Sequence, residues 1–282
     1  KHVDGEINSF IDGYRKRDLF LKAGLETSNS LLLYGPPGCG KTTVAKYISS
    51  IMNLPLVTAK LDGLVSSLLG STAKNIRKIF DYASRRECIL FLDEFDVIAK
   101  LRDDKNELGE LKRVVNSLIQ NIDGFSTNNV LICATNHHQL LDPAVWRRFN
   151  KIISLEKPSP EEIQNLLRLT LQEFAPQVLG SKKRLEQVGD ALSGLSHSDI
   201  RTIVENSAKQ TIIHNRKELK ACEIFKEIFF FKNHNVGSEE GLIEFLLSHK
   251  VSHIEINECL EIPLRKIQNI SKSADLGVLT NG

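Results

Sequence analysis

The most informative stretch of this sequence is Gly35-Pro36-Pro37-Gly38-Cys39-Gly40-Lys41-Thr42, around which the rest of the chain is organised. It fits the pattern G-x-x-x-x-G-K-[ST], in which a glycine-rich loop lets backbone amides curl around phosphate oxygens. The apolar run 31–34 before it predicts a buried strand, and residues 43–48 after it predict the start of a helix. The amino end of such a helix adds unsatisfied N–H groups and partial positive charge. The alternative is a chance glycine-rich turn between a strand and a helix.

The residue types in this loop suit the binding of phosphate and a divalent cation. Gly38 and Gly40 leave room for the backbone to approach phosphate oxygens. The Lys41 side chain can reach the outer phosphates, and the Thr42 hydroxyl can hold Mg²⁺. The predicted binding set is Gly35, Pro36, Pro37, Gly38, Cys39, Gly40, Lys41, Thr42 and Thr43.

Length and composition indicate a globular protein with more than one domain. The 282 residues favour two domains, each large enough for its own core. A hydrophobic fraction of 41% and a charged fraction of 26% are ordinary for a soluble protein, and a net charge of +2 argues against polyanion binding by bulk electrostatics. No apolar run reaches the length of a membrane span and the cysteines show no paired spacing, so we expect a cytoplasmic protein with reduced thiols and no membrane contact. Residue 1 is Lys, which leaves open whether another segment precedes it.

Acidic residues follow a second buried strand. The continuous apolar run 88–92 is typical of the middle of a parallel sheet, and it ends in Asp93 and Glu94. Ligands of open α/β sheets bind at the carboxyl ends of the strands. One acid can therefore hold the Mg²⁺ shell while the other polarises a water molecule. The alternative is a strand that ends in a solvated acidic turn.

A third buried strand, 130–134, ends at Thr135 and Asn136. The Asn136 side chain could orient an attacking water at the same crevice, although asparagine is equally common as a turn former. Further strands are predicted at 54–59 and 152–155. The helices predicted between the strands are 6–24, 73–86 and 107–122. Five strands that alternate with helices predict an α/β, doubly wound sheet.

The composition changes at Pro158 and Pro160, which mark a linker. We therefore expect a large α/β nucleotide-binding domain at 1–156, a small all-helical lid at 157–236 and a short three-helix tail at 237–282. The lid helices are predicted at 160–174, 181–192, 196–213 and 218–231, with Ser196 and Ser198 as candidate caps. The tail helices are predicted at 242–249, 253–260 and 264–272, in helix-turn-helix spacing.

With these motifs in order, the chain resembles the AAA family of ATPases, within the AAA+ group, over residues 19–232. GPPGCGKT resembles the Walker A loop, ILFLDE the Walker B strand and LICATN sensor 1. LDPAVWRRF resembles the region that carries arginine fingers. The DGF triplet at 123–125 looks like the inter-subunit signalling motif, and GLSHSDI at 194–200 looks like sensor 2.

The resemblance implies a five-stranded parallel P-loop NTPase sheet that hydrolyses ATP with Mg²⁺. Asp93 would be the acid of the Mg²⁺ shell, Glu94 the catalytic base and Asn136 the sensing residue. Arg147 and Arg148 would project at the γ-phosphate bound by a neighbouring subunit of a hexameric ring. In isolation, the two arginines would be interpreted as a solvated basic pair at a helix end.

The combination LDEFDVIAKLRDD…ELGELKRVVNSLIQ…ATNH…LDPAVWRRF is similar to a bacterial group of single-ring AAA ATPases. Members of this group are often encoded beside a subtilisin-like serine protease. The resemblance implies a homo-oligomer that remodels or unfolds a protein substrate and gates or feeds such a protease. The alternatives are a nucleic-acid-linked or defence-associated switch ATPase whose nucleotide state gates a partner enzyme, and a scaffold whose nucleotide serves assembly only.

Three features depart from the family pattern. Leu68-Leu69-Gly70 stands where unfoldases carry an aromatic–hydrophobic–glycine triplet, so it is either an aliphatic substrate grip or the end of an amphipathic helix. His197 and Ser198 replace the usual Gly and Ala of sensor 2. Cys39 replaces the commoner Thr of the phosphate loop and could make the site sensitive to thiol reagents.

The tail permits two interpretations. Arg265, Lys266 and Lys272 could contact nucleic acid through a helix-turn-helix. However, residues 237–282 contain four basic and seven acidic side chains, a net charge of −3. Phosphate neutralisation supplies most non-specific affinity for DNA, so a protein-docking or packing module is the preferred interpretation.

Overall fold

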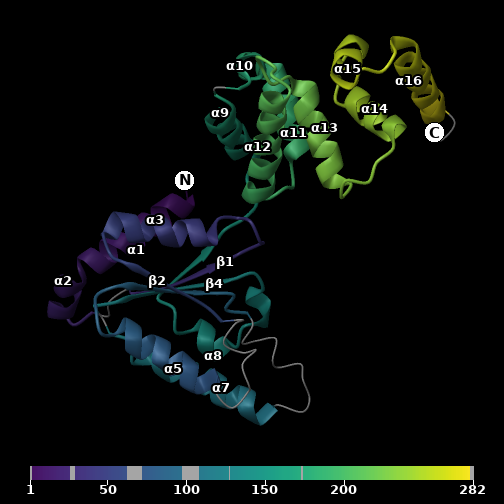
Figure 1. The fold of residues 1–282 in the computed structure, drawn as a ribbon. Coiled ribbons are helices and arrows are strands. Elements are labelled where there is room, and N and C mark those ends of the chain that lie inside the picture. Colours follow the sequence, from purple (N-terminus) through teal and green to yellow (C-terminus); the bar gives the residue numbers. More distant parts are fainter. Residues whose placement is uncertain are drawn as a thin grey trace. The chain divides into compact units, whose positions relative to one another are not determined.

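The computed structural model describes residues 2–25, 29–61, 72–96, 108–126, 128–172 and 174–279 (Figure 1). The predicted pore segment Leu68-Leu69-Gly70 lies outside these ranges. The chain divides into two compact units, residues 1–156 and 157–282.

The first unit contains a parallel sheet of five strands in the order β2-β3-β4-β1-β5. Its strands are β1 (Ser30–Tyr34), β2 (Leu56–Lys60), β3 (Ile89–Asp93), β4 (Val130–Thr135) and β5 (Lys151–Ser154). Its helices are α1 (His2–Arg15), α2 (Arg17–Lys22), α3 (Lys41–Met52), α5 (Thr72–Ala83), α7 (Leu108–Asp123), the 3₁₀ helix η3 (His138–Leu140) and α8 (Pro143–Trp146). The α/β sheet predicted from the sequence is confirmed.

Helices cover both faces of this sheet, as Figure 1 shows. Side chains of α1 and α3, such as Phe10 and Ile48, share one buried cluster with Leu31 and Leu33 of β1. Side chains of α5 and α7 share the other cluster with Leu32. The central strands are therefore apolar on both faces and buried between two layers of helices.

The register brings three strand ends to one edge. Tyr34 pairs with Thr135 and Leu92 pairs with Cys133, so β1, β3 and β4 finish side by side. The segments that follow these ends are the phosphate loop, the acidic turn and the turn that contains Asn136. The candidate site is therefore assembled by strand pairing and not by proximity in sequence.

The prediction of one helix over 6–24 is wrong, because the helix breaks at Lys16. Helix α1 ends at Arg15 and α2 begins at Arg17. Helix α1 buries Ile7, Phe10, Ile11 and Tyr14, whereas α2 buries no side chain. The buried apolar face of α1 extends as far as Tyr14. Helix α2 has no such face, and its Leu19 is 62% exposed.

The second unit is helical throughout its described residues. Its helices are α9 (Pro160–Leu171), α10 (Pro176–Gly180), α11 (Lys182–Leu192), α12 (His197–Ile213), α13 (Ala221–Lys232), α14 (Glu239–Ser248), α15 (His253–Leu260) and α16 (Leu264–Leu279). Ser196 forms a capping box with Asp199 at the start of α12, as predicted, while Ser198 lies inside the helix. The first lid helix ends earlier than predicted, and the short α10 follows it.

The last three helices share one hydrophobic core with the lid helices. Ile228 of α13, Ile243 of α14 and Ile256 of α15 are fully buried in the same cluster. Two ion pairs add to this packing: Arg184 of α11 binds Glu255 through two hydrogen bonds of 2.7 and 2.8 Å, and Lys220 binds Glu258 at 2.6 Å. Residues of α14 and α15 are thus packed in one core with α13, and Glu255 of α15 joins α11.

Replacing Gly35 by Ala should destabilise the first unit. A Cβ at this position would lie 2.0 Å from the Leu155 carbonyl oxygen, and the φ of Gly35 is +145°. We expect the free energy of unfolding to fall by about 3 kcal/mol, the upper end for a strained backbone position. Urea unfolding followed by the fluorescence of Trp146, the single tryptophan, measures the stability of this unit.

The control is Gly5→Ala in α1, where open space surrounds the glycine and the free energy of unfolding is expected to rise by about 0.5–1 kcal/mol. An unchanged midpoint for Gly35→Ala would contradict the prediction.

Candidate functional site

The phosphate loop is a turn that only glycine adopts easily at three of its positions. Gly35, Gly38 and Gly40 have φ values of +145°, +75° and +91°, and Gly40 caps α3. Helix α3 begins at Lys41, so the first N–H groups of the helix lie next to the loop. This arrangement is the strand–loop–helix context that the motif requires.

Lys41 is held inside the loop. Its side chain is 7% exposed, and its Nζ donates to the carbonyl oxygens of Gly35 at 2.8 Å and Pro36 at 2.9 Å. Burial lowers the pKa of Lys41 from its ordinary value, and the neighbouring Cys39 and Asp93 partly oppose this shift. A bound phosphate would offset the cost of desolvation, because it supplies negative charge at short range.

Thr42 and Asp93 are brought together across 51 positions of sequence. The Thr42 hydroxyl donates to Asp93 Oδ2 at 3.3 Å, which links the start of α3 to the end of β3. Hydroxyl and carboxylate oxygens are ligands that Mg²⁺ accepts, usually together with phosphate oxygens and water. The donor set present at this position therefore fits a magnesium ion.

Glu94 and Asn136 follow neighbouring strands. Glu94 has a φ of +57°, which is uncommon for a residue other than glycine, and its backbone N–H donates to Asp93 Oδ1 at 2.9 Å. Asn136 directly follows β4, which pairs with β3. A carboxylate and an amide at adjacent strand ends can act on the same water molecule.

Two of the remaining loop residues differ in exposure. Cys39 is 5% exposed and its thiol lies 3.9 Å from the carbonyl oxygen of Pro37, so the thiol faces the loop interior. Thr43, the third residue of α3, is exposed. The sensitivity to thiol reagents suggested by the sequence stays a prediction, and burial of Cys39 would slow such a reaction.

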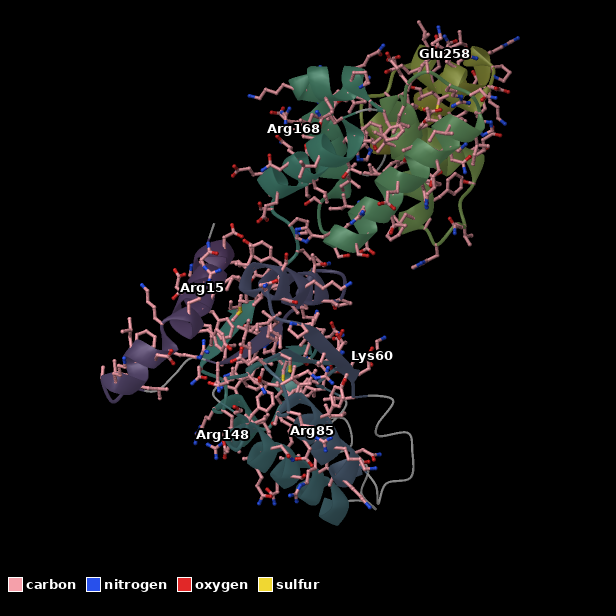
Figure 2. The ribbon with its side chains drawn as sticks, turned by 60° about the vertical axis from the view of Figure 1, so that its left-hand side comes forward. Arg15, Lys60, Arg85, Arg148, Arg168 and Glu258 are labelled. Atoms are coloured by element: carbon pink, nitrogen blue, oxygen red, sulfur yellow. The ribbon has the colours of Figure 1, made fainter. Side chains whose placement is uncertain are left out.

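Arg148 lies near the amino-terminal ends of the strands, whereas the phosphate loop lies at their carboxyl ends. Its carbonyl oxygen accepts a hydrogen bond from the hydroxyl of Ser30, the first residue of β1, whereas the loop follows the last residue of that strand. Its Nε binds Asp123 Oδ1, at the end of α7, at 2.9 Å. In Figure 2, Arg148 and Lys60, which ends β2 at the carboxyl edge, lie on opposite sides of this unit.

Arg147 has a different environment from Arg148. Its side chain is exposed, and within the described ranges it takes part in no ion pair. Both arginines follow α8, which is capped by the Asp142 carboxylate and begins with Pro143. No hydrogen bond or ion pair found in the described ranges joins either arginine to the phosphate loop of its own chain.

Sequence reasoning missed one acidic residue at this edge. Asp96 is 2% exposed, and its Oδ1 accepts hydrogen bonds from the Thr135 hydroxyl and the Asn136 backbone. The signal that could have revealed it is a second acid two positions after Glu94, directly behind a buried aromatic residue. Its partners come from another strand, which local patterns do not show.

ATP binding should take up protons at alkaline pH. Burial holds the pKa of Lys41 below 10.5, and a bound triphosphate favours the charged ammonium and raises this pKa again. At a pH between these two pKa values, the Lys41 side chain is partly neutral in the free protein and charged in the complex with ATP. Affinity should therefore fall as the pH rises through the lowered pKa.

Calorimetric titration in two buffers of different ionisation enthalpy measures this uptake. The same titration at a pH where the free ammonium is already fully charged is the control, and Lys41 should contribute no uptake there. Proton release, or no uptake at any alkaline pH, would contradict the assignment of Lys41 to the phosphates.

Comparison with known proteins adds to this geometry. Residues 31–157 match the family described as "ATPase family associated with various cellular activities (AAA)". The chain is 40% identical over 207 residues to an uncharacterized AAA family ATPase, y4kL, of Sinorhizobium fredii, covering 73% of this chain and 61% of the relative. It is 30% identical over 243 residues to the proteasome-activating nucleotidase of Thermococcus onnurineus, covering 84% of this chain and 59% of the relative.

A third relative is the ATP-dependent zinc metalloprotease FtsH of a Sulfurovum species, 28% identical over 272 residues, covering 91% of this chain and 40% of the relative. The chain thus spans about three fifths of the length of the first two relatives. None of its described helices is both long and apolar enough to cross a bilayer. The matched residues, 31–157, contain the phosphate loop, Asp93 and Asn136. Over residues 31–157, which carry these groups, the chain is similar to the AAA family of ATPases.

Proposed function

We propose that this chain is the ATP-hydrolysing subunit of a homo-oligomeric ring, a hexamer, that remodels or unfolds a protein substrate. Two relatives support the protein substrate by their names, because one is a proteasome-activating nucleotidase and another an ATP-dependent metalloprotease. The proposal includes a subtilisin-like serine protease as the partner that the ring gates or feeds. It also includes a lid at 157–236 and a tail at 237–282 as separate functional parts of the second unit.

The single observation that carries the chemistry is the 3.3 Å contact between Thr42 and Asp93 at the mouth of the phosphate loop. Lys41 binds the outer phosphates of ATP, and Thr42 and Asp93 hold Mg²⁺. The ion neutralises charge on the phosphate oxygens when it is bound. Glu94 accepts a proton from the attacking water, and Asn136 orients that water.

The position of Arg148 supports a shared site. Five residue steps along β1 separate Ser30, which contacts Arg148, from Gly35, and they span about 16 Å. An arginine side chain anchored at the far edge by Asp123 does not cover that distance. We therefore assign Arg148, together with the exposed Arg147 beside it, to the γ-phosphate bound by the next subunit, where an arginine stabilises charge in the transition state.

A nucleic-acid role for the tail is the less favoured alternative. Lys266, one of the three cations proposed for nucleic acid, binds Glu239 at 2.6 Å within the tail, and this hydrogen bond raises its pKa. The tail also packs its apolar residues into the core of the lid. Stimulation of ATP hydrolysis by DNA, and not by an unfolded protein, would favour the alternative.

Glu94→Gln should bind ATP normally and hydrolyse it at least about 10²-fold more slowly, because the amide cannot accept the proton from water. Turnover and the affinity for a fluorescent ATP analogue measure the two effects separately. The matched control is Glu87→Gln, an exposed glutamate of the same unit, which should behave as the parent protein. Normal turnover by Glu94→Gln would rule out Glu94 as the base.

Arg147→Ala should lower turnover by about 10³-fold or more without weakening ATP binding by its own subunit. The reason is that each subunit of the variant keeps an intact phosphate loop, whereas the neighbouring subunit no longer supplies the Arg147 guanidinium. Mixing this variant with Lys41→Ala should restore part of the activity, because the second variant supplies the arginine to sites of the first. Arg85→Ala, an exposed arginine near the end of α5, is the control. If the mixture never exceeds the sum of its parts, the arginine does not act between subunits.

A further inference from the structure

Asp96 is a buried acid that the reaction described above does not use. Its side chain is 2% exposed, and it follows β3 by three residues. A buried carboxylate is costly unless hydrogen bonds stabilise it. Asp96 accepts hydrogen bonds from the Thr135 hydroxyl, at the end of β4, at 3.2 Å and from the Asn136 backbone N–H, in the following turn, at 3.3 Å.

Further hydrogen bonds fix the backbone on both sides of Glu94. Before it, Asp93 Oδ1 accepts the Glu94 N–H at 2.9 Å. After it, the N–H of Phe95 donates to the Ala134 carbonyl at 2.9 Å, and the Phe95 ring is fully buried with an edge-on contact to Phe149. Glu94 thus keeps its left-handed φ of +57° because its neighbours are held to β4.

The network also reaches the phosphate loop. The carbonyl oxygen of Thr135 accepts a hydrogen bond of 3.3 Å from the backbone N–H of Gly35. The Thr135 hydroxyl accepts a further bond of 3.1 Å from the N–H of His137. Thr135 is 1% exposed, so water does not compete for these contacts. Thr135 therefore connects three parts of the site: its backbone carbonyl binds the phosphate loop, and its hydroxyl binds Asp96 and the turn after β4.

We propose that Asp96, acting through Thr135, is a positioning residue for ATP hydrolysis that fixes Glu94 and Asn136 relative to each other. Neither Asp96 nor Thr135 touches the substrate in this arrangement; they set the geometry of the groups that do. This inference rests on the roles proposed for Glu94 and Asn136. A misplacement of about 1 Å at a reacting group can cost 10²-fold in rate.

The test uses the matched pair Thr135→Val and Thr135→Ser, because replacing the buried Asp96 could unfold the protein. Valine has the shape of threonine but lacks the hydroxyl that donates a hydrogen bond to Asp96. Serine keeps this hydroxyl. We expect Thr135→Val to lower kcat by about 10²-fold with the ATP affinity changed by less than about threefold. Thr135→Ser should recover turnover to within about threefold of the parent protein.

A cycle with Asp96→Asn adds an independent measurement. If both residues act through one hydrogen bond, the double variant Asp96→Asn/Thr135→Val should lose less kcat than the product of the two single losses. Melting temperatures of all variants are compared, because a loss that follows stability and not the hydroxyl would indicate a purely structural role. Normal kcat for Thr135→Val, or an equal loss for Thr135→Ser, overturns the inference.

Glu94→Gln separates this inference from the proposed function. If the parent protein hydrolyses ATP, Glu94→Gln abolishes hydrolysis and Thr135→Val is normal, only the positioning role of Asp96 fails. If Glu94→Gln is fully active, the assignment of the base fails, and a loss in Thr135→Val must then be explained through another group.

Discussion

The parallel pairing of β1, β3 and β4 is the constraint on which the candidate site depends. The loop after β1, the acids after β3 and the amide after β4 carry different chemistry and lie far apart in sequence. They share one edge only because Leu32 and Leu92 both pair with Cys133 of β4. These strands are apolar on both faces and buried between two helical layers, so the sheet cannot open without exposing both cores.

Two buried charged side chains further restrict the structure at the carboxyl ends of these strands. Lys41 and Asp96 are each less than a tenth exposed, and a buried charge is tolerated only when hydrogen bonds compensate for the lost water. Lys41 bonds to the carbonyls of its own loop, and Asp96 to the strand end beside it. The chain therefore organises most of the proposed hydrolytic site within one subunit. The proposal assigns the remaining cation to the neighbour because Arg148 is anchored at the other edge.

The second unit shows how a familiar pattern can serve packing. The spacing of α14, α15 and α16 is that of a helix-turn-helix, yet Ile243, Ile256 and Ile267 are fully buried in the core that includes α11 and α13. The Arg184–Glu255 pair, with two hydrogen bonds, adds an orientation-specific contact between α11 and α15. Separating these helices from α11 and α13 would expose the apolar core that they share.

The phosphate loop, the strands and the parallel sheet could be predicted from the sequence, because these follow from local patterns: a glycine-rich turn, apolar runs and the residues that end them. The sequence did not determine the break at Lys16, since the break depends on where α1 stops finding a surface to pack against. Nor did it reveal the bond between Asp96 and Thr135 or the anchoring of Arg148 by Asp123. Those contacts join residues 25 or more positions apart, and only the pairing of strands and the packing of helices brings them within hydrogen-bonding distance.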